Sequence, residues 1–292
     1  MKKDRICISI CSRRFNYNFL KLLDCIYKNS LNKNLKINLL IVFNCSTKIK
    51  KFQEKLIKKT LKKIIFKIIY EKKKGISYVR NKCLSYLKYT NFDYYCFLDD
   101  DCKIKNNYII NHLKFIKNSN CSIVSGPQFY ESNKLFFKVF ERNFIQGQKI
   151  FWASTNNVFF KKKVLKNNVF FSNKVSRYGF GEDQLFFSKL FRKGEVIKWN
   201  HNPVYEISQK RRENLKWFID RNIKYGLTGL LIDKEIYNFS MAYILNIIKA
   251  FYNLFLASVY LFLIPIDLTN NFYKSFAYSL RFFGRSINFV KF

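Results

Sequence analysis

Three consecutive carboxylates, Asp99, Asp100 and Asp101, form a group that could hold a metal ion. They directly follow the apolar run 94–98, which is typical of a strand buried on both faces of a parallel sheet. Open α/β sheets bind their ligands at the carboxyl ends of such strands. Because adjacent carboxylates repel one another unless a cation neutralises them, and because oxygen ligands favour hard ions, the triplet predicts a Mg²⁺ or Mn²⁺ site. A solvated acidic turn would give the same pattern.

Alternating apolar and amphipathic segments lead up to the triplet. We expect four strands, at residues 5–11, 37–43, 64–70 and 94–98. We expect three helices between them: one capped by Asn16 and reaching Tyr27, a lysine-rich one ending near Leu61, and one following the turn Gly75–Asn81 to about Lys88. This alternation indicates an α/β fold with a mixed, mostly parallel sheet flanked by helices.

The elements after the triplet are less regular. We expect helices at 107–117, 134–146, 213–225 and from about 182 to Arg192, and strands at 121–125 and 151–160. The second of these strands has a polar interruption at Asn156-Asn157. The turn Tyr178–Asp183 places two glycines and two carboxylates immediately before a helix.

The composition indicates a folded, strongly basic chain. Lysine and arginine number 54 against 19 acidic residues, a net charge of +35, while 49% of the residues are hydrophobic and 19% aromatic. The apolar content supports a sizeable core and excludes a disordered chain. The charge attracts polyanions, which include nucleic acids, anionic lipid headgroups and nucleotide phosphates, so it does not identify a partner by itself.

Eight cysteines lie between Cys7 and Cys121, none of them in a CxxC pair, and the chain has two histidines. A Cys/His zinc site is therefore poorly supported, and reduced thiols in a reducing compartment explain the cysteines better. No long apolar stretch follows the first residues, so we expect no signal peptide.

Several short motifs, in this order, resemble the inverting nucleotide-sugar glycosyltransferases of family 2, which have a GT-A fold. The motifs are Ile10-Cys11-Ser12, Gly75 with Arg80-Asn81, Phe97-Leu98-Asp99-Asp100-Asp101, Asn156-Asn157 and Gly181-Glu182-Asp183. Each motif is weak alone, but their order makes the set more specific, and the resemblance covers about residues 5–230. It implies a GT-A (Rossmann-like) domain over residues 1–235.

The resemblance also implies roles for individual residues. Asp101 would bind the divalent metal that bridges the donor diphosphate, with Asp99 near the ribose or the metal. Arg80 would approach the diphosphate, for which a guanidinium is suited, although a surface arginine on a helix is the alternative. Asp183 matches the catalytic base best, with Glu182 beside it, and the alternative is an acidic helix N-terminus favoured by the helix dipole. The other donor-binding positions implied are Cys11, Ser12, Asn44, Asn81, Asp100 and Asn156.

Two positions depart from the family pattern. Asn44 stands where the family often has an Asp that reads the base, and an amide can still hydrogen-bond a base edge. A histidine commonly serves the family as a further metal or phosphate ligand, and Glu206 matches that position better than the slightly earlier His201.

Residues 236–292 predict a hydrophobic helical appendage. The run 242–266 is long enough to cross a hydrocarbon core of about 30 Å, but Lys249 favours a snorkelling end or a helix at the interface. The aromatic and basic residues that follow are typical of membrane-surface helices, and a core-packing helical pair is the alternative. We expect association with the cytoplasmic face of a membrane. Removal of the residues after Tyr237 should then release a folded, soluble domain.

Together these expectations describe a metal-dependent, inverting transfer of a sugar from a nucleotide diphosphate sugar to a glycan or lipid-linked acceptor, with Mg²⁺ or Mn²⁺ as cofactor. A nucleotidyltransferase could use the same triplet, but it would more often carry a glycine-rich phosphate loop near the first strand, and residues 9–14 contain no glycine. A basic, non-catalytic nucleic-acid-binding protein is the other alternative. No helix-turn-helix, RNP-type or zinc-finger signature supports it, so we expect no nucleic-acid partner.

Overall fold

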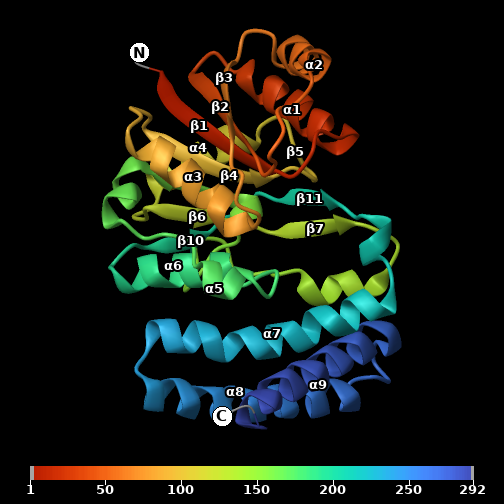
Figure 1. Cartoon of the computed structure of the whole chain (residues 1–292). Helices are drawn as coiled ribbons and strands as arrows, with labels where there is room; N and C mark the ends of the chain where they lie inside the picture. Colours follow the sequence, from red (N-terminus) through yellow and green to blue (C-terminus); the bar gives the residue numbers. More distant parts are fainter. Residues whose placement is uncertain (1–2, 291–292) are drawn as a thin grey trace. The chain divides into compact units, whose positions relative to one another are not determined.

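A computed structural model of the chain describes residues 3–290 and divides them into two compact units (Figure 1). The first unit contains the chain up to Phe129 together with Arg142–Asn173 and Phe186–Ile207. The second contains Tyr130–Glu141, Lys174–Leu185 and the chain from Ser208 onward. The predicted boundary between residues 235 and 236 falls inside the second unit.

The first unit is built on an eight-stranded sheet in the order β3-β2-β1-β4-β9-β6-β10-β8. The strands are β1 (Asp4–Ser12), β2 (Leu35–Phe43), β3 (Ile65–Tyr70), β4 (Tyr94–Asp99), β6 (Ile123–Ser125), β8 (Lys149–Ile150), β9 (Val158–Lys161) and β10 (Ile197–Trp199). Neighbouring strands are parallel except where β9 meets β4 and β6 and where β8 meets β10. The predicted mixed, mostly parallel sheet is confirmed.

Helices cover both faces of this sheet because its central strands are apolar on both sides. Alternation along β1 sends Ile6, Ile8 and Ile10 into one core and Cys7 and Cys11 into the other. The first core also takes residues of α1 (Tyr17–Ser30), α2 (Lys51–Leu61) and α4 (Tyr108–Asn118). The second takes residues of α3 (Ile76–Lys88) and of α6 (Glu182–Arg192) from Phe186 onward. The predicted cap holds: Asn16 Oδ1 accepts a hydrogen bond of 2.9 Å from the backbone N–H of Phe19.

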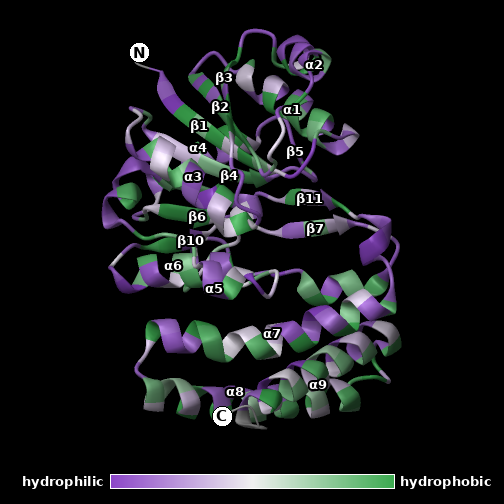
Figure 2. Cartoon of the chain, viewed as in Figure 1, coloured by the Kyte–Doolittle hydropathy of each residue, from purple (hydrophilic) through white to green (hydrophobic). Residues whose placement is uncertain are grey.

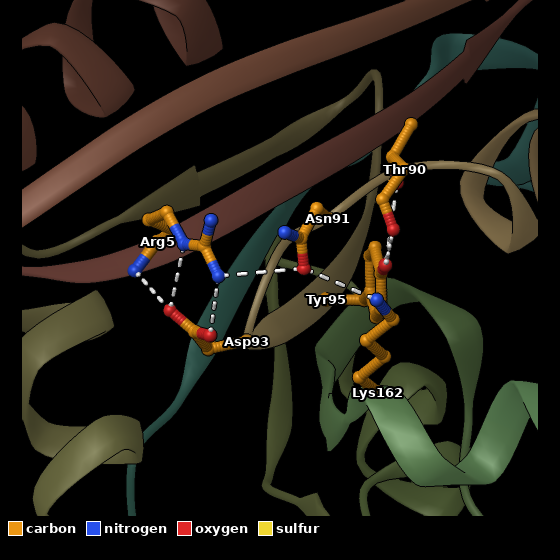
Figure 3. Close-up of polar contacts among 6 residues, drawn as sticks. All are labelled: Arg5, Thr90, Asn91, Asp93, Tyr95 and Lys162. Atoms are coloured by element: carbon orange, nitrogen blue, oxygen red, sulfur yellow. Dashed lines mark hydrogen bonds and ion pairs between the residues drawn. The ribbon is translucent and has the colours of Figure 1, made fainter.

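The amino ends of β1 and β4 are joined by polar contacts (Figure 3). Asp93 accepts hydrogen bonds from the Arg5 guanidinium at 3.0 and 3.2 Å and from the Arg5 backbone N–H at 3.0 Å. Lys162 donates to Asn91 at 3.2 Å, and the hydroxyls of Thr90 and Tyr95 lie 3.2 Å apart. These contacts fix the start of the register in which Ile6 lies opposite Tyr94.

Several strands were not predicted from the sequence. Three of them, β5 (Cys102–Ile104), β11 (Val204–Ile207) and β7 (Gln128–Glu131), form a second sheet in the order β5-β11-β7. The others are β8 and β10. Each of the five contains two to four residues, which is too short for a periodic pattern to appear.

Four predicted elements are wrong in extent. The helix expected at 213–225 continues to Ile236, and the turn expected at Gly75–Asn81 is mostly helical because α3 begins at Ile76. The helix expected at 134–146 is only a short 3-10 helix, η1 (Leu135–Phe140), because Phe136 and Phe137 are held by ring contacts rather than by a continuing helical face. The strand expected at 151–160 is reduced to β9. It is preceded by another 3-10 turn, η2 (Thr155–Asn157), whose Asn157 side chain is fixed by four hydrogen bonds, described below.

The second unit is dominated by three helices, α7 (Leu215–Ile236), α8 (Phe239–Phe262) and α9 (Leu268–Val290). Asn214 and Asn238 cap the first two, each accepting a backbone N–H at 2.9 Å. Where α7 and α9 cross, a Cβ built on Gly226 or Gly284 would collide with the backbone of the other helix. The chain therefore uses glycine to bring these two helices close together. The unit also takes η1, the short helix α5 (Asn173–Ser176) from Lys174 onward, and the start of α6.

One helix among residues 3–290, α8, is long and apolar enough to cross a membrane. Its most apolar window has a mean hydropathy of 1.5, and 17% of that window is buried. Figure 2 shows green, hydrophobic turns along this helix. Length and composition do not separate a spanning helix from one that packs or lies on a surface.

Candidate functional site

The acidic triplet lies where the sequence predicts, at the carboxyl end of a buried parallel strand. Asp99 is the last residue of β4 and lies opposite Cys11 of β1. The Ser12 hydroxyl, at the end of β1, makes a short contact with Asp100 Oδ2 and lies 2.9 Å from the Arg14 carbonyl, so its one hydrogen can be donated to either oxygen. The ends of β1 and β4 therefore bring Ser12 and the triplet together.

Arg80 reaches the triplet from the first half of α3. Its side chain is almost fully buried, and Nη2 lies 3.5 Å from Asp99 Oδ1. The guanidinium carbon also lies 5.6 Å from the centroid of the Phe171 ring. A buried guanidinium held in this way is not the surface arginine of the alternative interpretation, and its charge faces the end of the sheet.

Asn81, the next residue, makes a different set of contacts. Its amide donates to the Phe171 carbonyl at 2.9 Å and accepts from the Phe171 N–H at 2.7 Å. Ser77 on the same helix donates to the Ser172 carbonyl at 3.0 Å. Asn81 therefore anchors the 171–172 segment beside Arg80.

Asn44 follows β2 and organises the loop that leads into α3. Its amide nitrogen donates to the carbonyls of Glu71 at 3.0 Å and Lys73 at 2.7 Å, and its oxygen accepts the Gly75 N–H at 3.0 Å. Gly75 has φ of +135°, a conformation that side chains rarely adopt. The Asn44 side chain thus fixes the position from which α3 and Arg80 begin.

Asp101 and Glu206 are two buried carboxylates on neighbouring chain segments, 6% and 5% exposed. Glu206 lies on β11 opposite Cys102 of β5, and the N–H of Ile207 donates to the Asp101 carbonyl at 2.8 Å. The Gln128 amide makes a short hydrogen bond to Glu206 Oε2.

The Cys102 thiol lies within the field of these acidic groups. Burial, and then the charges of Asp101, Asp99 and Glu206, raise the pKa of that thiol well above its usual range. The shared direction of these effects indicates that Asp99, Asp101 and Glu206 all lie near the buried Cys102.

His201 takes part in a separate turn. Its Nε2 lies 2.6 Å from the Phe144 carbonyl, and its backbone N–H donates to Gln146 Oε1 at 2.6 Å. Of the two residues weighed from the sequence, Glu206 is the one placed beside Asp101.

The carboxylate oxygens near Asp101 are the type of ligand that a hard divalent cation prefers. They do not, however, form a complete set of protein ligands around an ion. Within residues 3–290 no group of three or more His, Cys, Asp or Glu side chains is placed so that it could hold a metal ion by itself. Mg²⁺-type sites are usually completed by substrate phosphates around one or two carboxylates. Asp101, with Asp99 and Glu206 near it, fits that open type of site.

Asn156 and Asn157 are adjacent in sequence but have different surroundings. Asn157 is fully buried and satisfied: its Oδ1 lies 2.7 Å from the Tyr108 hydroxyl and 3.1 Å from His112 Nε2, and its amide donates to two backbone carbonyls. Asn156 is buried as well, but its Oδ1 has no hydrogen-bond partner among the described residues. Since η2 packs against β4, Asn156 presents an open acceptor in that part of the first unit.

The network around Asn157 was missed by sequence reasoning. Asn200 Nδ2 lies 3.2 Å from His112 Nδ1, which makes His112 the neutral tautomer with its proton on Nε2. Burial lowers the pKa of His112 to about 3, against an ordinary 6.5. Gly126 is required here because a Cβ would lie 2.8 Å from the Asn157 amide nitrogen. The residues of the Asn157 network are spread over nearly 100 positions of the sequence, so no regular spacing in the sequence could have revealed the network.

The two carboxylates proposed for proton transfer belong to the second unit. Glu182 and Asp183 open α6; Glu182 is buried, whereas Asp183 is partly exposed and its Oδ1 accepts the Gln184 N–H at 2.7 Å. Gly181 before them has φ of +95°, and a Cβ there would lie 3.1 Å from Val175 and 3.2 Å from Ile232. The turn is therefore fixed in shape, and Asp183 is the more accessible carboxylate.

Comparisons with known proteins give one family and a set of similar folds. The sequence model of glycosyl transferase family 2 matches residues 10–179. No curated protein sequence matches the chain.

Among solved structures, S. aureus TarS 1–349 in complex with UDP-GlcNAc aligns with a TM-score of 0.57 at 17% identity, over 82% of this chain and 67% of that chain. A longer S. aureus TarS structure gives 0.56 at 17% identity, over 80% and 40%. The Pyrobaculum calidifontis mannosyltransferase PcManGT with GDP-Man and Mn²⁺ gives 0.56 at 16% identity, over 77% and 63%. The chain thus spans about two thirds or less of the length of these proteins, and at such identity the likeness is one of fold.

Proposed function

The chain belongs to glycosyl transferase family 2, and from that premise we propose that it moves a sugar from a nucleotide diphosphate donor to an acceptor hydroxyl. The observation that carries the proposal is the end of β4, where a buried Arg80 and the carboxylates of the triplet meet. Similar folds that were solved with UDP-GlcNAc and with GDP-Man and Mn²⁺ support a nucleotide-sugar donor.

In this proposal Asp101, with Asp99 and Glu206, would hold Mg²⁺ or Mn²⁺ together with the donor diphosphate. The ion would neutralise the charge that develops on the leaving diphosphate. Arg80 would donate hydrogen bonds to the same group, because a buried guanidinium is the donor best matched to phosphate oxygens.

The neighbouring polar residues divide into donor-binding and positioning roles. Asn156, with its open Oδ1, would accept a hydrogen bond from a hydroxyl of the donor. Ser12 and Asp100 would remain bonded to each other and shape the floor of the donor site, with Cys11 buried beneath them. Asn44 and Asn81 would act as positioning residues, because their amides are already bonded to backbone.

The chemical step we propose is a single displacement. The acceptor oxygen attacks the anomeric carbon, the bond from that carbon to the phosphate oxygen breaks, and the diphosphate leaves with the electron pair. Asp183 takes the proton of the acceptor hydroxyl. One displacement inverts the anomeric configuration.

The acceptor we propose is a glycan or a lipid-linked sugar at the cytoplasmic face of a membrane. The long apolar helix α8 supports a lipid-associated acceptor, and the net charge of +35 supports attraction to anionic headgroups.

The experiment is a panel of nucleotide sugars, tested by calorimetry for binding to the purified chain with and without Mn²⁺. We expect one nucleotide class to bind more tightly with Mn²⁺, and Asp101→Asn to remove that gain because a neutral amide does not replace the carboxylate charge. Asp24→Asn, which changes a surface carboxylate paired with Lys28, is the matched control and should retain the gain. Equal donor affinity in Asp101→Asn would remove this residue from the metal site. No binding across the panel would reject the donor class.

A further inference from the structure

The outward side of α8 is an apolar stripe. Ile244, Ile248, Phe251, Phe255 and Phe262 recur with helical spacing, and all five side chains are exposed. Between Phe239 and Phe262, all of which the structure describes, Lys249 is the only charged residue; 41% of its side chain is exposed, and its ammonium is paired with Asp233. At 24 residues the helix is about 36 Å long. An apolar face of this length, with the exposed Ser258 between Phe255 and Phe262, is still far more than the scattered exposed leucines of a soluble surface.

The opposite side of α8 is occupied by polar and ionic contacts. Lys249 Nζ lies 2.6 Å from Asp233 Oδ1 of α7, and Arg285 of α9 lies 3.9 Å from the other oxygen of that carboxylate. Arg285 also donates to Asn246 Oδ1 at 2.8 Å, and Ser275 donates to the Ala257 carbonyl at 2.8 Å. A spanning α8 would carry this ionic cluster, near its middle, into hydrocarbon, which is costly for three charged groups.

Lysine and tyrosine side chains flank the outward stripe. Lys234 donates to the Tyr243 hydroxyl at 3.1 Å and lies over the Phe239 ring. Lys274 lies 5.0 Å from the centroid of the Tyr260 ring. Tyrosine rings and snorkelling lysines are the residues that meet lipid headgroups at the edge of an apolar face.

We propose that α8 lies in the plane of a bilayer that contains anionic lipid, with the outward stripe among the upper parts of the acyl chains and with Lys234 and Lys274 at the headgroups. The ionic contacts to α7 and α9 then stay on the side away from the hydrocarbon. This proposal deepens the membrane association proposed above. Its readout is lipid binding without any donor, so its failure and the failure of the transferase proposal can be told apart.

The depth of individual residues of α8 in the bilayer distinguishes a helix that lies in the membrane plane from a helix that spans the membrane. Ile244→Trp, Phe251→Trp and Phe262→Trp, made one at a time, place a reporter at the start, middle and end of the stripe. Each variant of the full chain is mixed with phosphatidylcholine and phosphatidylglycerol vesicles brominated near the headgroup or near the chain ends, and its quenching is compared with that of the unsubstituted chain. We expect all three reporters to be quenched most by the shallow bromines. Deepest quenching at Phe251→Trp with shallow quenching at both ends would mean a spanning helix and overturn the proposal.

A charged residue introduced into the outward stripe tests whether this stripe is the surface that binds the vesicles. Phe251→Asp should lower partition into these vesicles by about tenfold or more, because it puts a charged group where the proposal places an aromatic ring among the acyl chains. Phe151→Asp is the matched control, since Phe151 is 70% exposed against 63% for Phe251 and belongs to the first unit. It should partition as the unsubstituted chain does, and pure phosphatidylcholine should bind more weakly than the mixture.

Equal partition of Phe251→Asp and Phe151→Asp would overturn the proposal. So would the absence of vesicle binding by the unsubstituted chain. If that absence came with a dimer in ultracentrifugation that Phe251→Asp dissolves, the stripe would be an interface between two copies instead. Circular dichroism of each variant establishes that the helices are intact.

Discussion

The three carboxylates at the end of β4 have three different environments, although the sequence presents them as equivalent. Asp100 is bonded by Ser12, Asp99 lies 3.5 Å from the Arg80 guanidinium, and Asp101 is buried close to Glu206. A metal ligand needs a carboxylate whose charge other protein cations do not neutralise. The charge of Asp99 is already met by the Arg80 guanidinium, which makes Asp99 a weaker ligand for a metal ion.

Single substitutions at Glu182 and Asp183 test which of the two carboxylates is the catalytic base. Asp183→Asn keeps the size of the side chain and removes its basicity, so donor binding should survive while transfer falls by at least ~10²-fold. Glu182→Gln is the matched control, because it makes the same chemical change on the buried neighbour. Steady-state transfer and donor titration of both variants are the measurements. Full activity in Asp183→Asn with loss in Glu182→Gln would move the role to Glu182, and full activity in both would exclude this turn.

His112 predicts a pH dependence of stability. Its pKa is about 3 in the folded chain, because burial disfavours the imidazolium, and 6.5 when unperturbed. Between these values the unfolded chain binds a proton that the folded chain does not. The free energy of unfolding should therefore rise with pH through this window, by up to about 1.4 kcal/mol per pH unit, and level off above pH 6.5.

The test for His112 compares urea unfolding from pH 4 to 8 with that of His112→Gln. Glutamine can still donate to Asn157 and accept from Asn200, but it does not titrate, so the variant should lose this part of the slope. His201→Gln makes the same substitution at an exposed histidine outside this network and is the matched control. A slope in His112→Gln equal to that of the unsubstituted chain would show that His112 titrates alike in both states.

At the scale of elements, the turn before α6 depends on Gly181 for two reasons. It has a positive φ, and its missing side chain leaves room for Val175, Ile232 and Thr228. Gly179 also has a positive φ, but nothing would meet a Cβ there within 4 Å.

Gly181→Ala should consequently destabilise the chain more than Gly179→Ala. Backbone strain costs about 1–2 kcal/mol in each variant, and crowding adds roughly 1–3 kcal/mol in Gly181→Ala alone. Urea unfolding of the two variants measures the difference. Equal midpoints would mean that the neighbours of Gly181 give way without cost.

The contrast between predicted and observed elements has a physical basis. β1 to β4, α4 and the end of α2 were predicted within about two residues because each element is long enough to show its period. The cap of α1 at Asn16 was predicted too, but α1 ends at Ser30 and not at Tyr27, and α3 begins at Ile76, inside the segment expected to be a turn. Strands such as β8 and β10 were not predicted, because they form by pairing with segments that are distant in the sequence and have no periodic pattern of their own. For the same reason the sequence could not show that the amides of Asn44 and Asn81 bond backbone groups 27 to 90 residues away; that these two residues bind the donor stays a prediction.

At the scale of the molecule, the structure revises what truncation after Tyr237 should do. The deletion removes α8 and α9, and α9 supplies Ala277, Tyr273 and Phe276 to the aromatic cluster around Phe218 of α7. Phe218 is fully buried. Arg281 also donates to Asn222 Oδ1 at 2.9 Å, and the buried Asp233 loses both Lys249 and Arg285.

We therefore expect the truncated chain to be destabilised rather than simply released from lipid. Exposure of a buried phenylalanine and of an unpaired carboxylate should together cost several kcal/mol. The full chain with Phe251→Asp and Phe255→Asp is the matched control, because it alters only the outward stripe and should keep its melting temperature. Thermal unfolding by circular dichroism and the elution volume on size exclusion compare the two. A truncated chain that is monomeric and melts as the full chain does would show that α7 needs neither partner helix, and the second unit would then have to be divided at Tyr237.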